Sequence, residues 1–225
     1  MATHLDLEEQ EQLDQLKSFW KEYGNLITWA LIAVLGAYAA WNGWTWWQRD
    51  QATKASAIFE EFDKSASAGD VAKTAGIFND MKERFPRTTL TQQAGLMTAK
   101  LQVEKGQADA AVASLEWVGQ NATEAEYQTI ARLRLAGLLL DQKKYDEALK
   151  QLDAATAKDF VALVADRRGD VLAAQGKLDA AKAAYTAAWK AMDAKISYRR
   201  LIEAKLAAMG AAPAEEDKKV EAAKQ

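Results

Sequence analysis

Three octapeptides decide the fold of this chain: EKGQADAA at 104–111, DQKKYDEA at 141–148 and AQGKLDAA at 174–181. Each one joins two segments rich in Ala and Leu through a short polar turn. The aspartates that the copies share, Asp109, Asp146 and Asp179, are 37 and 33 residues apart. A period of roughly 20–50 residues indicates stacked supersecondary units. The pattern therefore predicts an array of helix pairs, each pair closed by one of these turns.

Working outward from the octapeptides, helix-breaking sites divide the remaining sequence into similar segments. After Trp47 the first break is Gly69-Asp70, and the others are Phe85-Pro86, Gly106, Lys143-Lys144, Gly176 and Gly210. Between the breaks, Ala- and Leu-rich stretches show helical spacing, and the whole chain holds only 2 Pro. We predict an all-α fold, in which about 3–4 helix pairs form a solenoid with a final capping helix.

The unit resembles the tetratricopeptide repeat, a helix–turn–helix of about 34 residues. In the last copy Gly169 takes the small position of the first helix and Leu172 an apolar one, while Ala181, Tyr185 and Ala188 match the second helix. The other copies match through Leu135, Ala136, Leu139, Ala148, Leu152 and Ala155, through Ala99, Ala111, Leu115 and Val118, and, degenerately, through Phe62, Phe78, Met81 and Pro86.

The repeat register also predicts local roles. Asp109, Asp146 and Asp179 are expected to cap the second helix of each pair, because Asp accepts from free N–H groups there. The alanine two positions later is expected where paired helices approach closely. The capping helix is predicted over 196–209, with Leu201, Lys205 and Met209 on one stripe. We divide the chain into an arm (1–25), an apolar helix (26–47), the repeat domain (48–210) and a disordered tail (211–225).

Residues 26–47 are predicted to span a membrane. These 22 residues carry no charge, and a helix of that length rises roughly 33 Å, enough for a hydrocarbon core of about 30 Å. Aromatic residues gather where such a helix meets the two interfaces. The expected interface residues are Trp20, Tyr23, Trp41, Trp44, Trp46 and Trp47.

Two alternatives to an uncleaved span are less favoured. Ala37-Tyr38-Ala39 mimics a signal-peptide cleavage site, but the preceding arm is long and acidic, whereas a signal peptide begins with a short basic region. A buried core helix rarely has so long a charge-free run. Lys and Arg are nearly balanced on the two flanks, so the positive-inside rule does not decide the orientation.

The arm has one apolar face, made by Leu13, Leu16, Trp20 and Tyr23 at helical steps. It is expected to extend the anchor at the membrane surface, and a short partner-binding arm is the alternative.

Missing residue types exclude most catalytic chemistry. The chain has no Cys and a single His, His4, so it has no thiol nucleophile and no pair of His ligands. A net charge of −3 disfavours nucleic acid as a partner, because phosphate neutralisation needs a basic face. We therefore expect no enzyme activity, no cofactor, no metal site and no small-molecule substrate.

A solenoid binds partners on the concave surface lined by its first helices. The candidate groove residues are Leu96, Lys100, Val103, Leu133, Gly137, Leu140, Asp166, Asp170 and Ala173. Apolar side chains beside acids favour apolar or basic peptide segments. The alternative is that the leucines only pack between helices. The basic pairs Lys143-Lys144, Arg167-Arg168 and Arg199-Arg200 are expected on solvated turns and helix faces rather than in anion sites.

The whole arrangement is similar to the YfgM family of Gram-negative bacteria. The resemblance runs from about residue 8 to 209 and is carried by the acidic arm, the junction Gly43-Trp44-x-Trp46-Trp47-Gln48, the directly continuous repeat domain, and Gln51-Ala52 with Ala55–Phe59. It implies an ancillary SecYEG translocon subunit in the inner membrane, with a cytoplasmic N-terminus and a periplasmic repeat domain. The implied partners are SecYEG, a PpiD-like chaperone and unfolded secreted polypeptides. A different membrane-tethered scaffold of the cell envelope and a stress-signalling adaptor are the alternatives.

Overall fold

The structure of the chain, a computed structural model, describes residues 7–213. Every element in that range is helical, which confirms the all-α prediction. The elements are α1 (Leu7–Ser67), α2 (Val71–Arg84), α3 (Thr89–Glu104), α4 (Ala108–Asn121), α5 (Ala125–Asp141), α6 (Tyr145–Asp153), the 3-10 turn η1 (Lys158–Phe160), α7 (Val161–Ala174), α8 (Leu178–Ala191) and α9 (Arg199–Ala208). The chain divides into two compact units, Met1–Gln51 and Ala52–Gln225.

The first unit consists of α1 up to Gln51, and its surface over residues 26–47 is largely apolar. The region Glu11–Ser67 contains a window of mean hydropathy 1.4 that is 6% buried, so α1 is long and apolar enough to cross a membrane. Polar side chains in the apolar part bond to carbonyls of their own helix: Thr28 Oγ1 donates to Gly24 O at 2.7 Å, and Asn42 Nδ2 to Tyr38 O at 2.9 Å. Such local bonding suits a hydrocarbon setting, where no water is present to satisfy polar groups.

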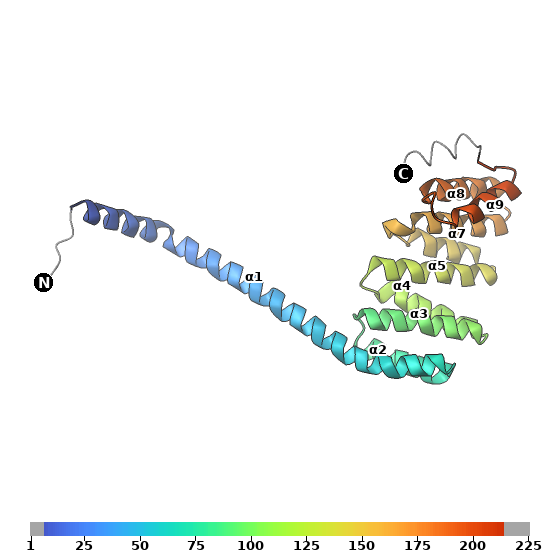
Figure 1. The fold of residues 1–225 in the computed structure, drawn as a ribbon, viewed down its shortest axis with the longest axis horizontal. Coiled ribbons are helices and arrows are strands. Elements are labelled where there is room, and N and C mark those ends of the chain that lie inside the picture. The colour runs from blue at the N-terminus through green and yellow to red at the C-terminus, as the bar shows by residue number, and fades with distance from the viewer. Residues whose placement is uncertain (1–6, 214–225) are drawn as a thin grey trace. The chain divides into compact units, whose positions relative to one another are not determined.

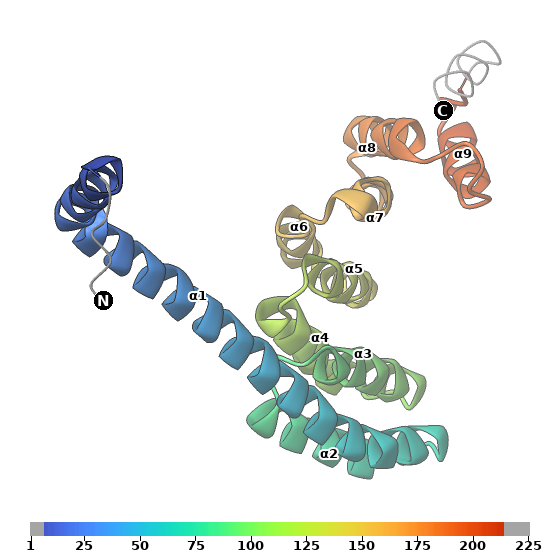
Figure 2. The same cartoon turned by 60° about the vertical axis from the view of Figure 1, so that its left-hand side comes forward.

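The second unit is a stack of antiparallel helix pairs (Figure 1). The pairs are α3 with α4, α5 with α6 and α7 with α8, while α2 packs on the end of α1 through Phe62, Phe78 and Met81. First helices α3, α5 and α7 lie on one side of the stack, and second helices α4 and α6 lie on the other (Figure 2). This order is the one that the repeat pattern predicts.

The turns between helices share one backbone motif. At each predicted break except Phe85-Pro86 the second residue after the helix has a positive φ, as at Gly106 (75°) and Gly176 (77°). In the turn between α3 and α4, Gln107 N donates to Gln102 O, and Gly106 N donates to Val103 O. This pair of bonds is the Schellman motif, which satisfies the last carbonyls of a helix. Lys143 occupies the corresponding position between α5 and α6 with a φ of 61°.

Small residues hold the paired helices together. Ala111, Ala148 and Ala181 are each 0% exposed, as the register predicts for points of close approach. Around them, leucines and aromatic rings form three clusters that follow the stack from Phe62 to Leu206. The aromatic residues Trp117, Tyr127, Tyr145, Tyr185 and Trp189 all lie within or against these clusters, as expected for core residues.

The predicted capping role of Asp109, Asp146 and Asp179 is wrong. The capping positions are held by Gln107, Lys144 and Lys177, and no side chain bonds to the helix start there. The Schellman turn leads directly into the next helix, so the aspartates fall at its second residue instead of before it. There their charge favours the positive end of the helix dipole.

The final helix is shorter than predicted and faces the stack differently. α9 runs over Arg199–Ala208 and buries Ile202 and Leu206, whereas Leu201 is 47% exposed. Lys205 and Met209, the other members of the predicted stripe, are partly buried. Most of the predicted tail lies outside the described residues; Ala211, its first residue, packs against the cluster around Ile202.

Candidate partner-binding groove

A groove of about 440 Å³ runs across the first helices of the stack. It is lined by Ala99, Lys100, Val103, Glu104, Leu115, Arg134, Gly137, Leu138, Asp141 and Arg167. The lining comes chiefly from α3 and α5, and α7 adds Arg167; these three helices lie on one side of the stack (Figure 2). The groove is the surface that repeat geometry assigns to partner binding.

Three of the predicted groove residues line it. Lys100 and Val103 come from α3 and Gly137 from α5, and Val103 is 44% exposed. A Cβ atom on Gly137 would lie 3.8 Å from the Arg167 guanidinium, so the space beside this glycine is bordered by a cation.

The predicted leucines lie mainly between helices. Leu96 is 7% exposed. Leu133 and Leu140 are half-buried and pack against the central cluster, which is the arrangement of the packing alternative. Ala173 packs against the C-terminal cluster.

The predicted acids belong to an ionic network rather than to the groove lining. Asp166, which is 2% exposed, accepts from Lys205 Nζ at 2.8 Å and from the Tyr198 hydroxyl at 2.7 Å. Asp170 accepts from Lys205 Nζ at 2.7 Å and from the Tyr185 hydroxyl at 2.8 Å. These bonds tie α9 to α7 and occupy both carboxylates, so neither is available to a basic peptide.

The same network shifts two tyrosine pKa values. Burial and the hydrogen bond to Asp166 raise the pKa of Tyr198 to about 12. Burial and the bond to Asp170 raise the pKa of Tyr185 further above its ordinary value. Both phenols therefore stay protonated as donors far above neutral pH.

A row of three cations crosses the groove, and of these only Lys100 was among the predicted groove residues. Lys100, Arg134 and Arg167 stand on α3, α5 and α7 at intervals of 34 and 33 residues. Lys100 pairs with Glu104 at 3.7 Å, Arg167 pairs with Asp170 at 3.5 Å, and Arg134 Nη1 donates to Leu96 O. The sequence contains a signal for this row, because a basic residue recurs at the repeat interval of 33–34 residues.

With this row, the groove combines apolar and charged lining residues. Its apolar members are Ala99, Val103, Leu115 and Leu138. The three cations face two acids of the same lining, Glu104 and Asp141, so the lining has a small excess of positive charge. Such a lining suits an apolar segment, and its excess charge favours acidic over basic side chains beside that segment.

The basic pairs also differ in their surroundings. Arg168 donates to Asp153 at 2.6 Å on the outside of the stack. Arg199 is only 5% exposed, so the expectation that it is solvated is wrong. Its guanidinium lies 4.1 Å from the ring centre of Trp189 and is held there as part of the C-terminal core.

The predicted interface aromatics of α1 all project outward. Their exposed fractions run from 40% for Trp47 to 70% for Trp41 and Trp46. Trp44 and Trp47 form a tilted ring pair with centroids 5.2 Å apart. Their place at a membrane interface stays a prediction.

Across the part of the chain that the structure describes, no three His, Cys, Asp or Glu residues are grouped to hold a metal ion.

The fold and the groove define a class: helical-repeat proteins of the tetratricopeptide type that carry an N-terminal helix able to cross a membrane. The sequence model of the tetratricopeptide repeat-like domain family matches residues 17–211, which include most of α1 as well as the stack.

Known proteins identify the family within this class. Three similar proteins are each named ancillary SecYEG translocon subunit. The protein of Neisseria gonorrhoeae is 32% identical over 92% of this chain and 98% of its own length. That of Haemophilus influenzae is 31% identical over 78% and 86%, and that of Escherichia coli is 28% identical over 81% and 87%. The chain belongs to the YfgM family, as its sequence architecture predicted.

Proposed function

We propose that this chain is an ancillary subunit of the SecYEG translocon and assists the periplasmic chaperoning of secreted proteins. The observation that carries the proposal is its similarity, over almost its whole length, to a protein of that name. The similarity includes both the apolar helix and the repeat stack.

In this proposal residues 26–47 anchor the chain once in the inner membrane. The N-terminal arm lies in the cytoplasm and the stack in the periplasm. The exposed apolar surface of α1 supports an anchor, because a soluble helix rarely leaves so many large apolar side chains in water. The same helix, α1, contains both the proposed anchor and the first residues of the repeat domain.

The groove is proposed as the surface that holds a PpiD-like chaperone or segments of unfolded secreted polypeptides. Its apolar lining residues would bury apolar side chains of a client, each contributing about 1.5–3 kcal/mol when fully buried. Its basic row, Lys100, Arg134 and Arg167, would select segments with acidic residues nearby.

The topology can be tested cleanly because the chain has no Cys. Single cysteines are introduced at two exposed positions, Ser18 in the arm and Gln120 in α4. A membrane-impermeant maleimide should label Gln120→Cys in intact spheroplasts and label Ser18→Cys only after lysis. The opposite labelling pattern would place the stack in the cytosol and favour the adaptor alternative.

The partner is tested by purifying the full chain from membranes in mild detergent. SecYEG and a PpiD-like chaperone should be recovered in proportion to the chain, and recovery should survive a salt wash. Enrichment of other envelope complexes without SecYEG would reject the proposal and favour a different tethered scaffold.

A further inference from the structure

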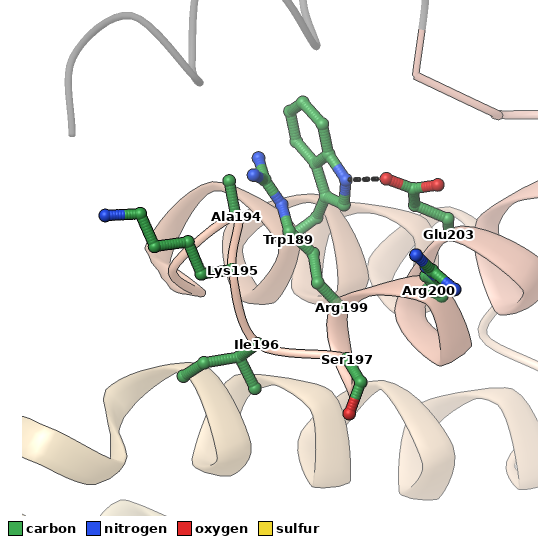
Figure 3. Close-up of a pocket in the computed structure, with 8 residues that line it drawn as sticks. All are labelled: Trp189, Ala194, Lys195, Ile196, Ser197, Arg199, Arg200 and Glu203. Carbon is green, nitrogen blue, oxygen red and sulfur yellow. Dashed lines mark hydrogen bonds between the residues drawn. The ribbon is translucent and has the colours of Figure 1, made fainter.

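A second pocket lies at the C-terminal end of the stack, apart from the groove. It holds about 320 Å³ between the end of α8, the connection after it and the start of α9. Its lining residues are Trp189, Ala194, Lys195, Ile196, Ser197, Arg199, Arg200 and Glu203 (Figure 3). Three of them are basic and one is acidic, so the lining carries a net positive charge.

Arg199 is the decisive residue of this pocket. It is 5% exposed, yet no described residue accepts a hydrogen bond from its Nε or its Nη2. Leaving donors of a buried charged group unpaired is costly, because the group has lost water without gaining a partner. Figure 3 shows the guanidinium beside the Trp189 indole, with Glu203 on the far side of that ring.

The two free donors have a specific geometry. Nε–H and Nη2–H lie along one edge of the guanidinium plane and point in the same direction. That edge matches the two oxygens of a carboxylate, which arginine binds through two parallel hydrogen bonds. Stacking on Trp189, at 4.1 Å from the ring centre, fixes the plane before any ligand arrives.

The surroundings favour an anion that is attached to an apolar group. Glu203 accepts from Trp189 Nε1 at 3.0 Å, so this carboxylate is engaged with the indole. Arg200 and Lys195 add positive charge around the pocket, while Ala194 and Ile196 supply apolar surface.

We propose that this pocket binds the C-terminal carboxylate of a partner polypeptide that ends in an apolar residue. Arg199 donates to the two carboxylate oxygens through Nε and Nη2, and the terminal side chain packs against Ala194 and Ile196. The proposal concerns the α8–α9 end of the stack and holds whether or not the chain binds a translocon.

The probe is a short fluorescein-labelled Gly-Ser peptide that ends in Phe with a free carboxylate. Its binding to the full chain in mild detergent is measured by fluorescence anisotropy. Matched probes carry a C-terminal amide, or an internal Asp followed by an amide. We expect the free acid to bind at least about tenfold more tightly than the amide, because hydrogen bonds between two charged groups are stronger than those to a neutral amide. Equal affinities of the free-acid and amide peptides would overturn the proposal. If the peptide with the internal Asp binds more tightly than the free acid, the proposal is also wrong, because the pocket then recognises an acidic side chain instead of a C-terminal carboxylate.

Three variants locate the binding. Arg199→Met keeps the apolar packing on Trp189 and should weaken binding of the acid at least about tenfold. Arg199→Lys keeps the charge but loses the pair of parallel donors, and should weaken it nearly as much. Arg168→Met makes the same charge change outside the pocket and should leave the affinity unchanged. Melting curves accompany each variant. If Arg199→Met unfolds, the folded Arg199→Lys variant decides, and unaltered affinity there rejects the assignment.

Discussion

Tyr185 of α8 lies directly against Gly169 of α7, so closely that a Cβ atom on the glycine would stand 2.5 Å from ring carbons Cδ1 and Cε1. The ring has little freedom to move aside, because its hydroxyl donates to Asp170 at 2.8 Å. The first helix of this repeat therefore needs a residue without a side chain at position 169, because the ring of Tyr185 from the second helix occupies that space.

Replacing Gly169 by Ala should therefore destabilise the stack. Overpacking of this kind costs about 1–3 kcal/mol, and the loss should be visible in urea unfolding followed by circular dichroism. Gly76→Ala in α2 is the matched control, because a Cβ there meets nothing within 4 Å. That control should stabilise by about 0.5–1 kcal/mol through the lower entropy of the unfolded chain. Similar effects of the two substitutions would contradict the packing argument.

Lys143→Gly should stabilise the domain. Lys143 has a φ of 61° in a turn whose counterparts at Gly106 and Gly176 are glycines. A left-handed conformation costs a residue with a Cβ roughly 1–2 kcal/mol, although Gly loses part of this gain through its flexible unfolded state. We expect a net gain of up to about 1 kcal/mol.

The neighbouring Lys144→Gly removes the same charge at a φ of −86° and should lower the stability instead. Thermal unfolding of both variants, side by side with the parent chain, separates the backbone effect from the charge effect. A gain for both would indicate that the charge was responsible.

These turns show how much of the fold the sequence specifies. Breaks at Gly69, Gly106, Gly176 and Gly210 could be predicted because a left-handed residue after a helix is usually glycine. Lys143 was also located, through its alignment with the glycine turns. The prediction places the start of the second helix of each pair too late. An acidic residue suits both the capping position and the first turn of a helix, so the sequence alone does not distinguish the two positions.

The groove shows where sequence periodicity fails. The predicted positions Leu133 and Leu140 and the observed ones Arg134, Leu138 and Asp141 lie on neighbouring faces of α5. Helical spacing identifies a face, but which face the next helix covers depends on the tilt between repeats. Leu133 and Leu140 are half-buried because their face of α5 turns toward the central cluster instead of the groove.

Raising the pH should destabilise the C-terminal end of the stack through Tyr198. Its folded pKa of about 12 exceeds the unfolded value of about 10. The stabilisation is therefore fully present below pH 10 and is lost as the pH rises through 12. Tyr198→Phe should be less stable at neutral pH, because Asp166 loses a donor, and its stability should decline less steeply above pH 10. Tyr127→Phe, in the central cluster, is the control. Parallel alkaline curves for Tyr198→Phe and the parent chain would contradict the assignment.

Truncation should be tolerated after Pro213 but not after Gly210. Ala211 N donates to Leu206 O at 2.9 Å, and Gly210 N donates to Ala207 O at 2.9 Å, which completes the Schellman motif of α9. A chain ending at 210 loses the first bond and the packing of Ala211. Differential scanning calorimetry should give the parent melting temperature for the chain ending at 213 and a value lower by a few degrees for the chain ending at 210. Equal melting temperatures would mean that the motif adds nothing to the stability of α9.

The last prediction separates binding from packing in the groove. Val103 is 44% exposed and lines the groove, so Val103→Ser should weaken client binding severalfold and leave the melting temperature nearly unchanged. Leu133→Ser with Leu140→Ser should mainly lower the stability, because both leucines pack against the central cluster. Large-to-small changes at fully buried sites cost about 2–5 kcal/mol each, and half-buried leucines should lose part of that.

Both variants are measured by anisotropy with a labelled unfolded polypeptide and by thermal melting of the same samples. Lys100→Gln tests the basic row on the same helix and should weaken binding of acidic segments more than that of neutral ones, with an effect that salt reduces. If the leucine pair lowers affinity without lowering the melting temperature, the leucines contact the client and the groove extends over the neighbouring face of α5. If Val103→Ser and Lys100→Gln both leave affinity unchanged, clients bind elsewhere on the stack.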